Sequence, residues 1–380
     1  MPLRSAFGHD RGRARWSGAT LQPIDAPVTG PGSGQGSGQQ APRRHVSDVL
    51  VALGWESFRP GEAPPVGVGR VRRVDRGEVD VLVDGGELRA ASDSMRAQSD
   101  MAPATGDWVV VVDEPQRGTI VESILSRRSA ITRRDPAEEV VEQVLVANVD
   151  VVGIVAAVDR PCNVARLERF MVLAEDSGAT PVVVLAKADL GLDADWQALA
   201  DALPDVAVLT TSAASGDGVE SVHDLIRDHR TLVLLGESGA GKSSLVNALV
   251  GTELQETSAV RSGDAKGRHT TIARELVLVP GGGVLIDTPG VRGVGLWDAR
   301  PALDRVFADI TRLAADCRFG DCAHVVEPGC AVRAAIDRGA LDELRFERYH
   351  RLRVELDEQA RLVEEQRRRP SGRRRRRGRP

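Results

Sequence analysis

The segment GESGAGKS at residues 236–243 has the residue types and spacing of a phosphate-binding loop. The apolar run TLVLL precedes it and SSLVNALV follows it, which is the order of strand, loop and helix that such a loop requires. Lys242 would neutralise β- and γ-phosphate oxygens, and Ser243 would ligate Mg²⁺. The alternative is an ordinary glycine-rich turn. The residues expected to contact phosphate here are Gly236, Glu237, Ser238, Gly239, Ala240, Gly241, Lys242, Ser243 and Ser244.

Two further segments have the features of nucleotide switches. DTPG at residues 287–290 follows the run VLID, so Asp287 would hold Mg²⁺ through water and the Gly290 amide would sense a γ-phosphate. The polar run GRHTTIA at residues 267–273 offers Thr270 and Thr271 as catalytic switch residues. An ordinary surface loop is the alternative. The magnesium ligands are assigned to Ser243, Thr271 and Asp287, with Thr270 as the other candidate threonine.

The tetrad AKAD at residues 186–189 and the run TSA at 211–213 predict a guanine site. The Asp189 carboxylate can accept two hydrogen bonds from the ring N–H and the exocyclic amine of guanine, which adenine does not present together. The Lys187 stem would lie along the base, with Ala186 beside it, and backbone amides near Ser212 and Ala213 would meet the guanine carbonyl. GTP is therefore favoured over ATP, with an adenine-nucleotide enzyme as an alternative.

The elements that position these motifs are apolar strands linked by helices. Runs such as VDVVGIVAAV, PVVVLA and VAVLTTSA alternate with helical patterns at residues 164–176, 196–202 and 219–229. Continuous apolar strands of this kind form a parallel sheet covered on both faces, with ligands beyond the carboxyl ends of the strands. The base-reading motifs precede the phosphate loop, whereas ordinary GTPases have the reverse order. The sequence therefore predicts a circularly permuted α/β GTPase domain.

Short β-type runs between residues 68 and 125 predict an all-β barrel of five strands before this domain. An oligonucleotide-binding (OB) barrel fits, and other small barrels would give similar alternation. Arg70, Arg72, Arg73 and Arg89 are candidates for an RNA-facing surface. A short amphipathic segment after residue 46 is expected to pack on this domain through Trp55.

Cys317, Cys322, His324 and Cys330 provide three thiolates and one imidazole, the ligand set of a closed structural zinc site. Free buried thiols are the alternative. The cluster interrupts a helical C-terminal region that ends in a charged helix at about residues 341–366. Cys162 stands apart from the cluster, and we expect it to be structural.

Composition indicates a multidomain cytoplasmic protein without a membrane partner. No apolar run approaches the roughly 18 residues that span a bilayer, and residues 1–17 lack a secretory signal. Residues 1–44 are rich in Gly, Pro, Ser and Gln and are expected to be disordered. Residues 367–380 carry nine arginines and no acidic residue, although the net charge is −5. Such a basic tail commonly binds nucleic acid, or it only solvates the chain end.

Together these motifs resemble a known family, the circularly permuted, small-ribosomal-subunit-dependent GTPases called RsgA, YjeQ or EngC. The resemblance covers about residues 46–366 and is carried, in family order, by QVLVANVDVV, VVVLAKADL, GESGAGKSSLVNAL, GRHTT, DTPGVRG and the cysteine spacing. It implies an OB-fold RNA-binding domain at 45–127, a permuted GTPase domain at 128–298 and a helical zinc-binding domain at 299–366. Disordered segments would flank them at 1–44 and 367–380.

The resemblance also implies an activity, cofactors and partners. The chain would be a monomer that binds GTP or GDP, Mg²⁺ and one structural Zn²⁺, and it would act in late maturation of the small ribosomal subunit. The barrel and zinc domain would contact rRNA, and hydrolysis stimulated by the ribosome would permit release. The alternative is an RNA-binding scaffold regulated by GTP, with incidental turnover.

Two positions depart from GTPase patterns. Val291 follows DTPG where a Ras-like enzyme has its water-positioning glutamine, and a valine side chain cannot orient water. The family resemblance points to His269 as the catalytic group that positions the attacking water, or as a residue that only stabilises the switch. Ala186 occupies the position where the family usually has Asn or Thr, whose side chain helps to fix the base-binding loop. We expect Ala186 to reduce guanine affinity while Asp189 preserves selectivity.

Overall fold

The structure is a computed structural model, and it describes residues 46–93, 101–134, 142–201, 206–251, 274–287, 296 and 299–368. The predicted disordered extension at residues 1–44 and most of the arginine tail lie outside this part of the chain. Within the described part, every helix is too short or too polar to cross a bilayer.

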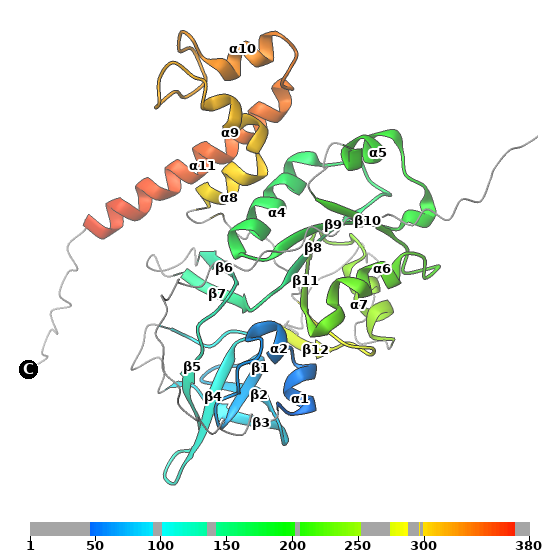
Figure 1. Ribbon diagram of the computed structural model, residues 1–380, viewed down its shortest axis with the longest axis vertical. Helices are drawn as coiled ribbons and strands as arrows, with labels where there is room; N and C mark the ends of the chain where they lie inside the picture. Colours follow the sequence, from blue (N-terminus) through cyan, green and yellow to red (C-terminus); the bar gives the residue numbers. More distant parts are fainter. Residues whose placement is uncertain are drawn as a thin grey trace, which may run out of the picture. The chain divides into compact units, whose positions relative to one another are not determined.

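Five antiparallel or mixed strands close into a barrel near the N-terminus, as the sequence predicted (Figure 1). Their order around the barrel is β1-β2-β3-β5-β4, which is OB-like. Small apolar side chains that alternate along the strands fill the interior, among them Val71, Val81, Val109 and Val121. The strands are β1 (Val68–Val74), β2 (Glu78–Val83), β3 (Gly86–Ala91), β4 (Trp108–Glu114) and β5 (Gly118–Ile124).

Two short helices, α1 (Asp48–Ala52) and α2 (Trp55–Phe58), precede the barrel. The Ser47 side chain caps α1 by accepting a hydrogen bond from the Leu50 N–H. The Trp55 ring lies edge-on to Trp108, with 5.0 Å between the ring centroids. The predicted amphipathic segment therefore does pack on the barrel through Trp55.

Arg70 does not face solvent, so the prediction that it lines an RNA-binding surface was wrong. It is 1% exposed and donates hydrogen bonds to the carbonyls of Leu53, Gly106 and Asn148 and to the Thr231 hydroxyl. Burial lowers the pKa of Arg70 to about 10, and nearby Asp150 and Asp107 oppose that shift. Arg70 thus joins the barrel to the first residue of the strand that leads to the phosphate loop.

The other three candidate arginines are partly exposed and paired with carboxylates. Arg72 forms ion pairs with Glu87 and, on the neighbouring domain, Glu275. Arg73 and Arg89 share a group of acidic partners, Asp75, Glu78 and Asp80. Because each of these guanidinium groups is paired with carboxylates, none of the three is a free cation that could contact RNA.

We expect Arg70→Met to destabilise the protein by about 3–5 kcal/mol, because it leaves several buried acceptors without their donor. Arg72→Met is the matched control, since its partly exposed ion pairs should contribute below about 1 kcal/mol. Urea unfolding followed by tryptophan fluorescence measures both. Equal shifts of the two midpoints would show that Arg70 has no special role.

A six-stranded sheet forms the second domain, in the order β10-β9-β8-β11-β13-β12. Its strands are parallel except for β12 at the edge, which runs antiparallel to β13. The strands first in sequence occupy one half of the sheet and those after residue 230 the other, as a permuted chain requires. The strands are β8 (Val151–Ala157), β9 (Thr180–Ala186), β10 (Ala207–Thr211), β11 (Thr231–Gly236), β12 (Glu275–Leu278) and β13 (Val284–Asp287).

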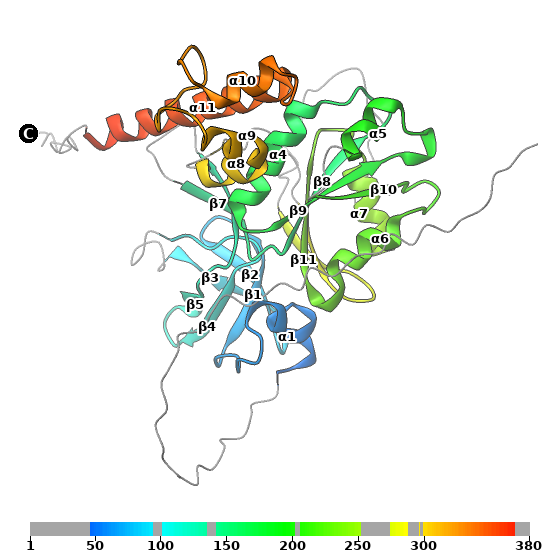
Figure 2. The same ribbon diagram turned by 45° about the horizontal axis from the view of Figure 1, so that its top comes forward.

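Helices cover both faces of this sheet (Figure 2). Helix α4 (Val164–Ser177) lies on one face, and α6 (Val219–His223) and α7 (Lys242–Val250) lie on the other. Successive strand residues face opposite layers. In β11, Val233 and Leu235 belong to the core under α4, whereas Leu232 and Leu234 belong to the core under α7. The remaining helices around the sheet are η1 (Ala188–Leu190), α5 (Ala194–Asp201) and η2 (Asp224–His229).

Two local features differ from the sequence prediction. A hairpin of β6 (Ala130–Arg134) and β7 (Glu142–Ala147) precedes the sheet, where no strand pair was predicted. The helix predicted at 219–229 is shorter, because α6 ends at His223 and the chain continues as a 3₁₀ segment before β11. Within that segment Arg227 and Asp228 have non-helical backbone angles.

The C-terminal region is helical, as predicted, with α8 (Arg300–Val306), α9 (Ala308–Ala314), α10 (Ala331–Asp337) and α11 (Glu343–Arg368). Arg345 and Arg348 of α11 bind Glu168 of α4, which is 2% exposed. Burial raises the pKa of Glu168, although the two arginines oppose that shift. These ion pairs, in which Glu168 is buried and the two arginines are partly exposed, fix the C-terminal helices against the sheet domain.

Candidate functional site

The phosphate loop connects β11 to α7, and its backbone passes close to β8. Gly236 has a φ of 150°, and a Cβ there would lie 2.3 Å from the Val155 carbonyl oxygen. Gly239 has a φ of 74°. Both positions therefore require glycine. The Lys242 amine donates hydrogen bonds to the Gly236 and Glu237 carbonyls at 2.8 and 2.6 Å. These bonds hold the ammonium over the loop, from where it would contact a bound phosphate.

A pocket of about 270 Å³ lies where β9 and β10 end. Both strands end at the same edge, because Thr211 of β10 is the register partner of Ala186 of β9. The pocket is lined by the predicted base-reading residues and by residues of the phosphate loop and α7: Ala186, Lys187, Asp189, Leu190, Thr211, Ser212, Ala213, Ala214, Gly241, Ser244 and Leu245. The base-reading motifs and the phosphate loop, which follow each other in the sequence in the reverse of the usual order, thus surround one pocket.

The turn after β10 is shaped by its own hydrogen bonds. Ser212 is 1% exposed, and its hydroxyl accepts hydrogen bonds from the Ala214 and Ser215 N–H groups, each at 3.2 Å. Its backbone carbonyl accepts from the Gly216 N–H at 2.9 Å. The Ser212 N–H also donates to the Asp217 carbonyl at 2.8 Å, so the side chain and the backbone of Ser212 both form the turn. The Ala213 backbone therefore remains the candidate to read a base.

The predicted magnesium site is described only in part. Ser243 lies in the first turn of α7, and Asp287 ends β13, the strand next to β11. His269, Thr270, Thr271 and Gly290 lie outside the described residues. The assignments to these six residues stay predictions.

Sequence reasoning missed a charged group that follows the carboxyl end of β8. Asp159 accepts a hydrogen bond from the Lys187 amine at 2.6 Å. Arg160 donates to the Ser238 carbonyl at 3.0 Å, and Arg166 forms an ion pair with Glu237. The only signal in the sequence was their place after a strand of the parallel sheet, since the ends of neighbouring strands meet at one edge.

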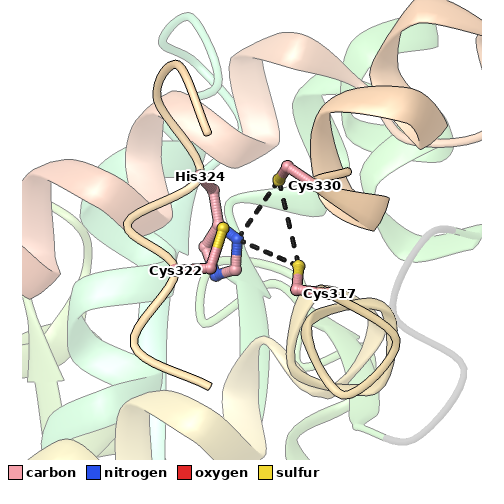
Figure 3. A group of neighbouring side chains, drawn as sticks. All are labelled: Cys317, Cys322, His324 and Cys330. Carbon is pink, nitrogen blue, oxygen red and sulfur yellow. Dashed lines mark hydrogen bonds between the residues drawn. The ribbon is translucent and has the colours of Figure 1, made fainter. Parts of the chain in front are cut away.

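The predicted metal ligands lie together in the C-terminal region (Figure 3). The Nδ1 atom of His324 is 3.5 Å from the sulfurs of Cys317 and Cys330, which are 3.9 Å apart. Tetrahedral zinc with Zn–S bonds of about 2.3 Å and Zn–N bonds of about 2.0 Å would separate two sulfurs by about 3.8 Å and sulfur from nitrogen by about 3.5 Å. The residues therefore fit a zinc ion.

The local electrostatics and the loop geometry also suit a metal. Burial raises the pKa of the Cys317 thiol, but hydrogen bonds from the backbone N–H groups of Ala331 and Val332 and from the Cys330 and Cys322 side chains together leave that pKa below its usual value. In the loop between Cys322 and Cys330, the Glu327 carboxylate accepts hydrogen bonds from the N–H groups of Ala323, Val325 and Val326. Together with its own N–H, these lower the pKa of Glu327 to about 2. Sequence reasoning did not identify this carboxylate.

Comparisons with known proteins agree with the geometry. The profile of the RsgA GTPase family matches residues 124–297. A Streptomyces avermitilis protein named small ribosomal subunit biogenesis GTPase RsgA is 46% identical over 330 residues, which cover 83% of this chain and 87% of that protein.

Two solved structures are similar to the chain. The crystal structure of YjeQ from Thermotoga maritima superposes with a TM-score of 0.57 at 26% identity, covering 76% of this chain and 98% of that one. The crystal structure of YloQ, described as a circularly permuted GTPase, gives a TM-score of 0.55 at 24% identity, covering 77% of this chain and 95% of that one. The second likeness concerns the fold alone.

Proposed function

This chain belongs to the RsgA GTPase family, and from that membership we propose that it hydrolyses GTP to GDP and phosphate as an assembly factor of the small ribosomal subunit. The observation that carries the proposal is the shared pocket, because Asp189 and Ala213 line it together with Gly241 and Ser244. Residues at one edge of the sheet would then bind the guanine at one end of the nucleotide and the phosphates at the other.

The proposed chemistry divides among the residues at this edge. Asp189 selects guanine, and Lys242 with the amides of the phosphate loop binds the β- and γ-phosphates. Bound Mg²⁺ would neutralise phosphate charge, and Ser243, Asp287 and a switch threonine, Thr271 or Thr270, would hold it. His269 is proposed to orient the attacking water, since the Val291 side chain has no polar atom to do so.

The proposed partner is the small ribosomal subunit, through its rRNA. The named relatives support the subunit, and the OB-like barrel supports RNA as the ligand. A zinc ion held by the Cys317, Cys322, His324 and Cys330 side chains would be structural, because four protein ligands leave no open position for a reacting water. We propose that the protein acts as a monomer in the cytoplasm.

The test is GTP turnover with and without isolated small subunits. We expect stimulation of at least about tenfold, because the chain lacks a water-positioning glutamine and would depend on its partner to order the switch. Turnover that is the same with and without subunits would reject the ribosomal role while leaving GTP binding intact.

A variant separates an enzyme from an RNA-binding scaffold with incidental turnover. His269→Ala is expected to reduce the subunit-stimulated rate by about 100-fold with little change in GTP affinity, as loss of a general base or water-orienting group does. If stimulated turnover is unaffected, His269 does not position water and the scaffold is favoured. Arg268→Ala, which removes the neighbouring side chain, is the control.

A further inference from the structure

We propose that Asp159 and Arg160 form a bridge between the base-reading turn and the phosphate loop, and that this bridge positions the two ends of the nucleotide site. The proposal rests on the proposed function, because it assumes that a guanine nucleotide occupies both ends. Neither residue belongs to the predicted nucleotide motifs. Both follow β8, the strand that lies between β9 and β11 in the sheet.

The first half of the bridge joins Asp159 to the base-reading turn. The Lys187 amine donates a hydrogen bond to the Asp159 carboxylate at 2.6 Å. Lys187 has a φ of 62°, a left-handed conformation that few residues other than glycine adopt. The ion pair with Asp159 therefore helps to hold this turn, in which Asp189 follows two residues later.

The second half joins Arg160 to the phosphate loop. The Arg160 guanidinium lies 3.8 Å from the Asp159 carboxylate and donates a hydrogen bond to the Ser238 carbonyl at 3.0 Å. Its Nη2 atom is 2.6 Å from where a Cβ of Gly239 would be, so the side chain lies directly on the loop backbone. The buried Trp196 side chain fixes the Arg160 backbone by donating to its carbonyl at 3.1 Å.

A second observation concerns the ends of β9 and β10. Thr211 is 1% exposed, and within the described part of the chain its hydroxyl has no hydrogen-bond partner. Its register partner on β9 is Ala186, whose methyl group lies 3.5 Å from the Cβ position of Gly241 in the phosphate loop. A methyl group can form a hydrogen bond neither with the Thr211 hydroxyl nor with the phosphate loop. The side chain of Ala186 therefore does not link β9, β10 and the phosphate loop.

The Asp159–Arg160 bridge thus connects the base-reading turn to the phosphate loop, which the apolar side chain of Ala186 cannot do. A nucleotide that spans both ends gains from contacts at each only when their separation is fixed, since ordering a mobile turn on binding opposes affinity. Loss of the bridge should therefore weaken GDP binding and accelerate its release, by about tenfold each, with most of the affinity change in the release rate.

The experiment measures binding and release of mant-GDP by the full-length chain. Arg160→Ala and Asp159→Ala should each weaken binding by about tenfold. The double variant should bind only slightly more weakly than either single variant, because both substitutions remove the same bridge. Arg166→Ala is the matched control, since Arg166 pairs with Glu237 of the same loop but not with Asp159, and it should change affinity by less than about twofold. Fully additive single effects, or equal effects of Arg160→Ala and Arg166→Ala, would overturn the bridge.

A rescue distinguishes positioning from a general loss of stability. Ala186→Asn places an amide beside Thr211 and should restore most of the affinity lost in Arg160→Ala, and adding Thr211→Val should remove that gain. Absence of rescue would overturn the inference that the bridge replaces an inner contact. If Arg160→Ala does not fold, Arg160→Gln serves the same test. Wild-type protein that fails to bind mant-GDP would reject the proposed function itself, whereas normal binding by both wild type and Arg160→Ala would reject only the bridge.

Discussion

Lys242→Ala is expected to reduce GTP turnover by at least about 100-fold at saturating GTP. The Lys242 ammonium is held over the phosphate loop by the Gly236 and Glu237 carbonyls, and it would stabilise negative charge that grows on the phosphate oxygens in the transition state. Loss of one such donor typically costs a factor of about 100–1,000 in kcat. Steady-state release of phosphate, with and without small subunits, measures the effect.

Lys187→Ala is the matched control, since Lys187 lies at the base end of the pocket and its amine binds Asp159. It should raise KM for GTP by about tenfold and change kcat by only a few-fold, because base contacts are made equally in the ground state and the transition state. A Lys242→Ala variant that keeps its turnover would contradict the assignment of residues 236–243 as a phosphate loop.

Removal of the metal is expected to have the second large effect. A strong chelator, or Cys330→Ser, should release one zinc ion per chain and unfold the loop between Cys317 and Cys330. This loop has few apolar contacts of its own, and Val325 and Val326 are 52% and 87% exposed. Structural zinc contributes folding free energy on the order of 10 kcal/mol in small domains. Metal analysis and hydrogen exchange over residues 315–331 measure the loss.

The chain contains its own control for this experiment. Cys162→Ser removes the one cysteine outside the cluster and should leave the zinc content unchanged. GDP affinity should change by less than about threefold in Cys330→Ser, because the pocket is built from the sheet domain, whereas subunit binding should weaken. A purified chain without zinc, or equal losses in Cys162→Ser and Cys330→Ser, would contradict a structural zinc site.

The strands and helices that position the site were predictable because their sequence patterns are local. Apolar runs such as TLVLL and PVVVL belong to strands that are buried on both faces, and both became central strands of the sheet. The five strands of the barrel likewise followed from alternation and turn residues. The permuted order of motifs was visible in the sequence because it needs only their positions along the chain.

The predictions for the barrel arginines failed because their partners lie on other segments of the chain. Arg70 has the positive charge of an RNA-binding residue, but its guanidinium donates hydrogen bonds to Leu53, Asn148 and Thr231, which come from three other segments. Arg89 is paired with Glu78 and Asp80 of the neighbouring strand β2. Charge alone therefore could not show whether an arginine faces solvent, is buried or is already paired.

The candidate site was predicted as motifs but not as a connected structure. Asp189, Ser212 and Gly241 were assigned from their sequence patterns, and the structure places all three around one pocket. Asp159 and Arg160 match no pattern, because their relation to Lys187 and Ser238 arises only where β8, β9 and β11 end at the same edge. The unpartnered Thr211 hydroxyl is likewise a consequence of strand register.

The central claim is that Asp189 and Lys242 bind opposite ends of one guanine nucleotide. Calorimetric titration of the wild-type chain with GDP and with ADP, repeated with Asp189→Asn, tests it most directly. We predict one bound GDP per chain, at least about 100-fold weaker binding of ADP, and loss of most of that selectivity in Asp189→Asn. Equal affinity for GDP and ADP in the wild type, or unchanged selectivity in Asp189→Asn, would contradict the claim.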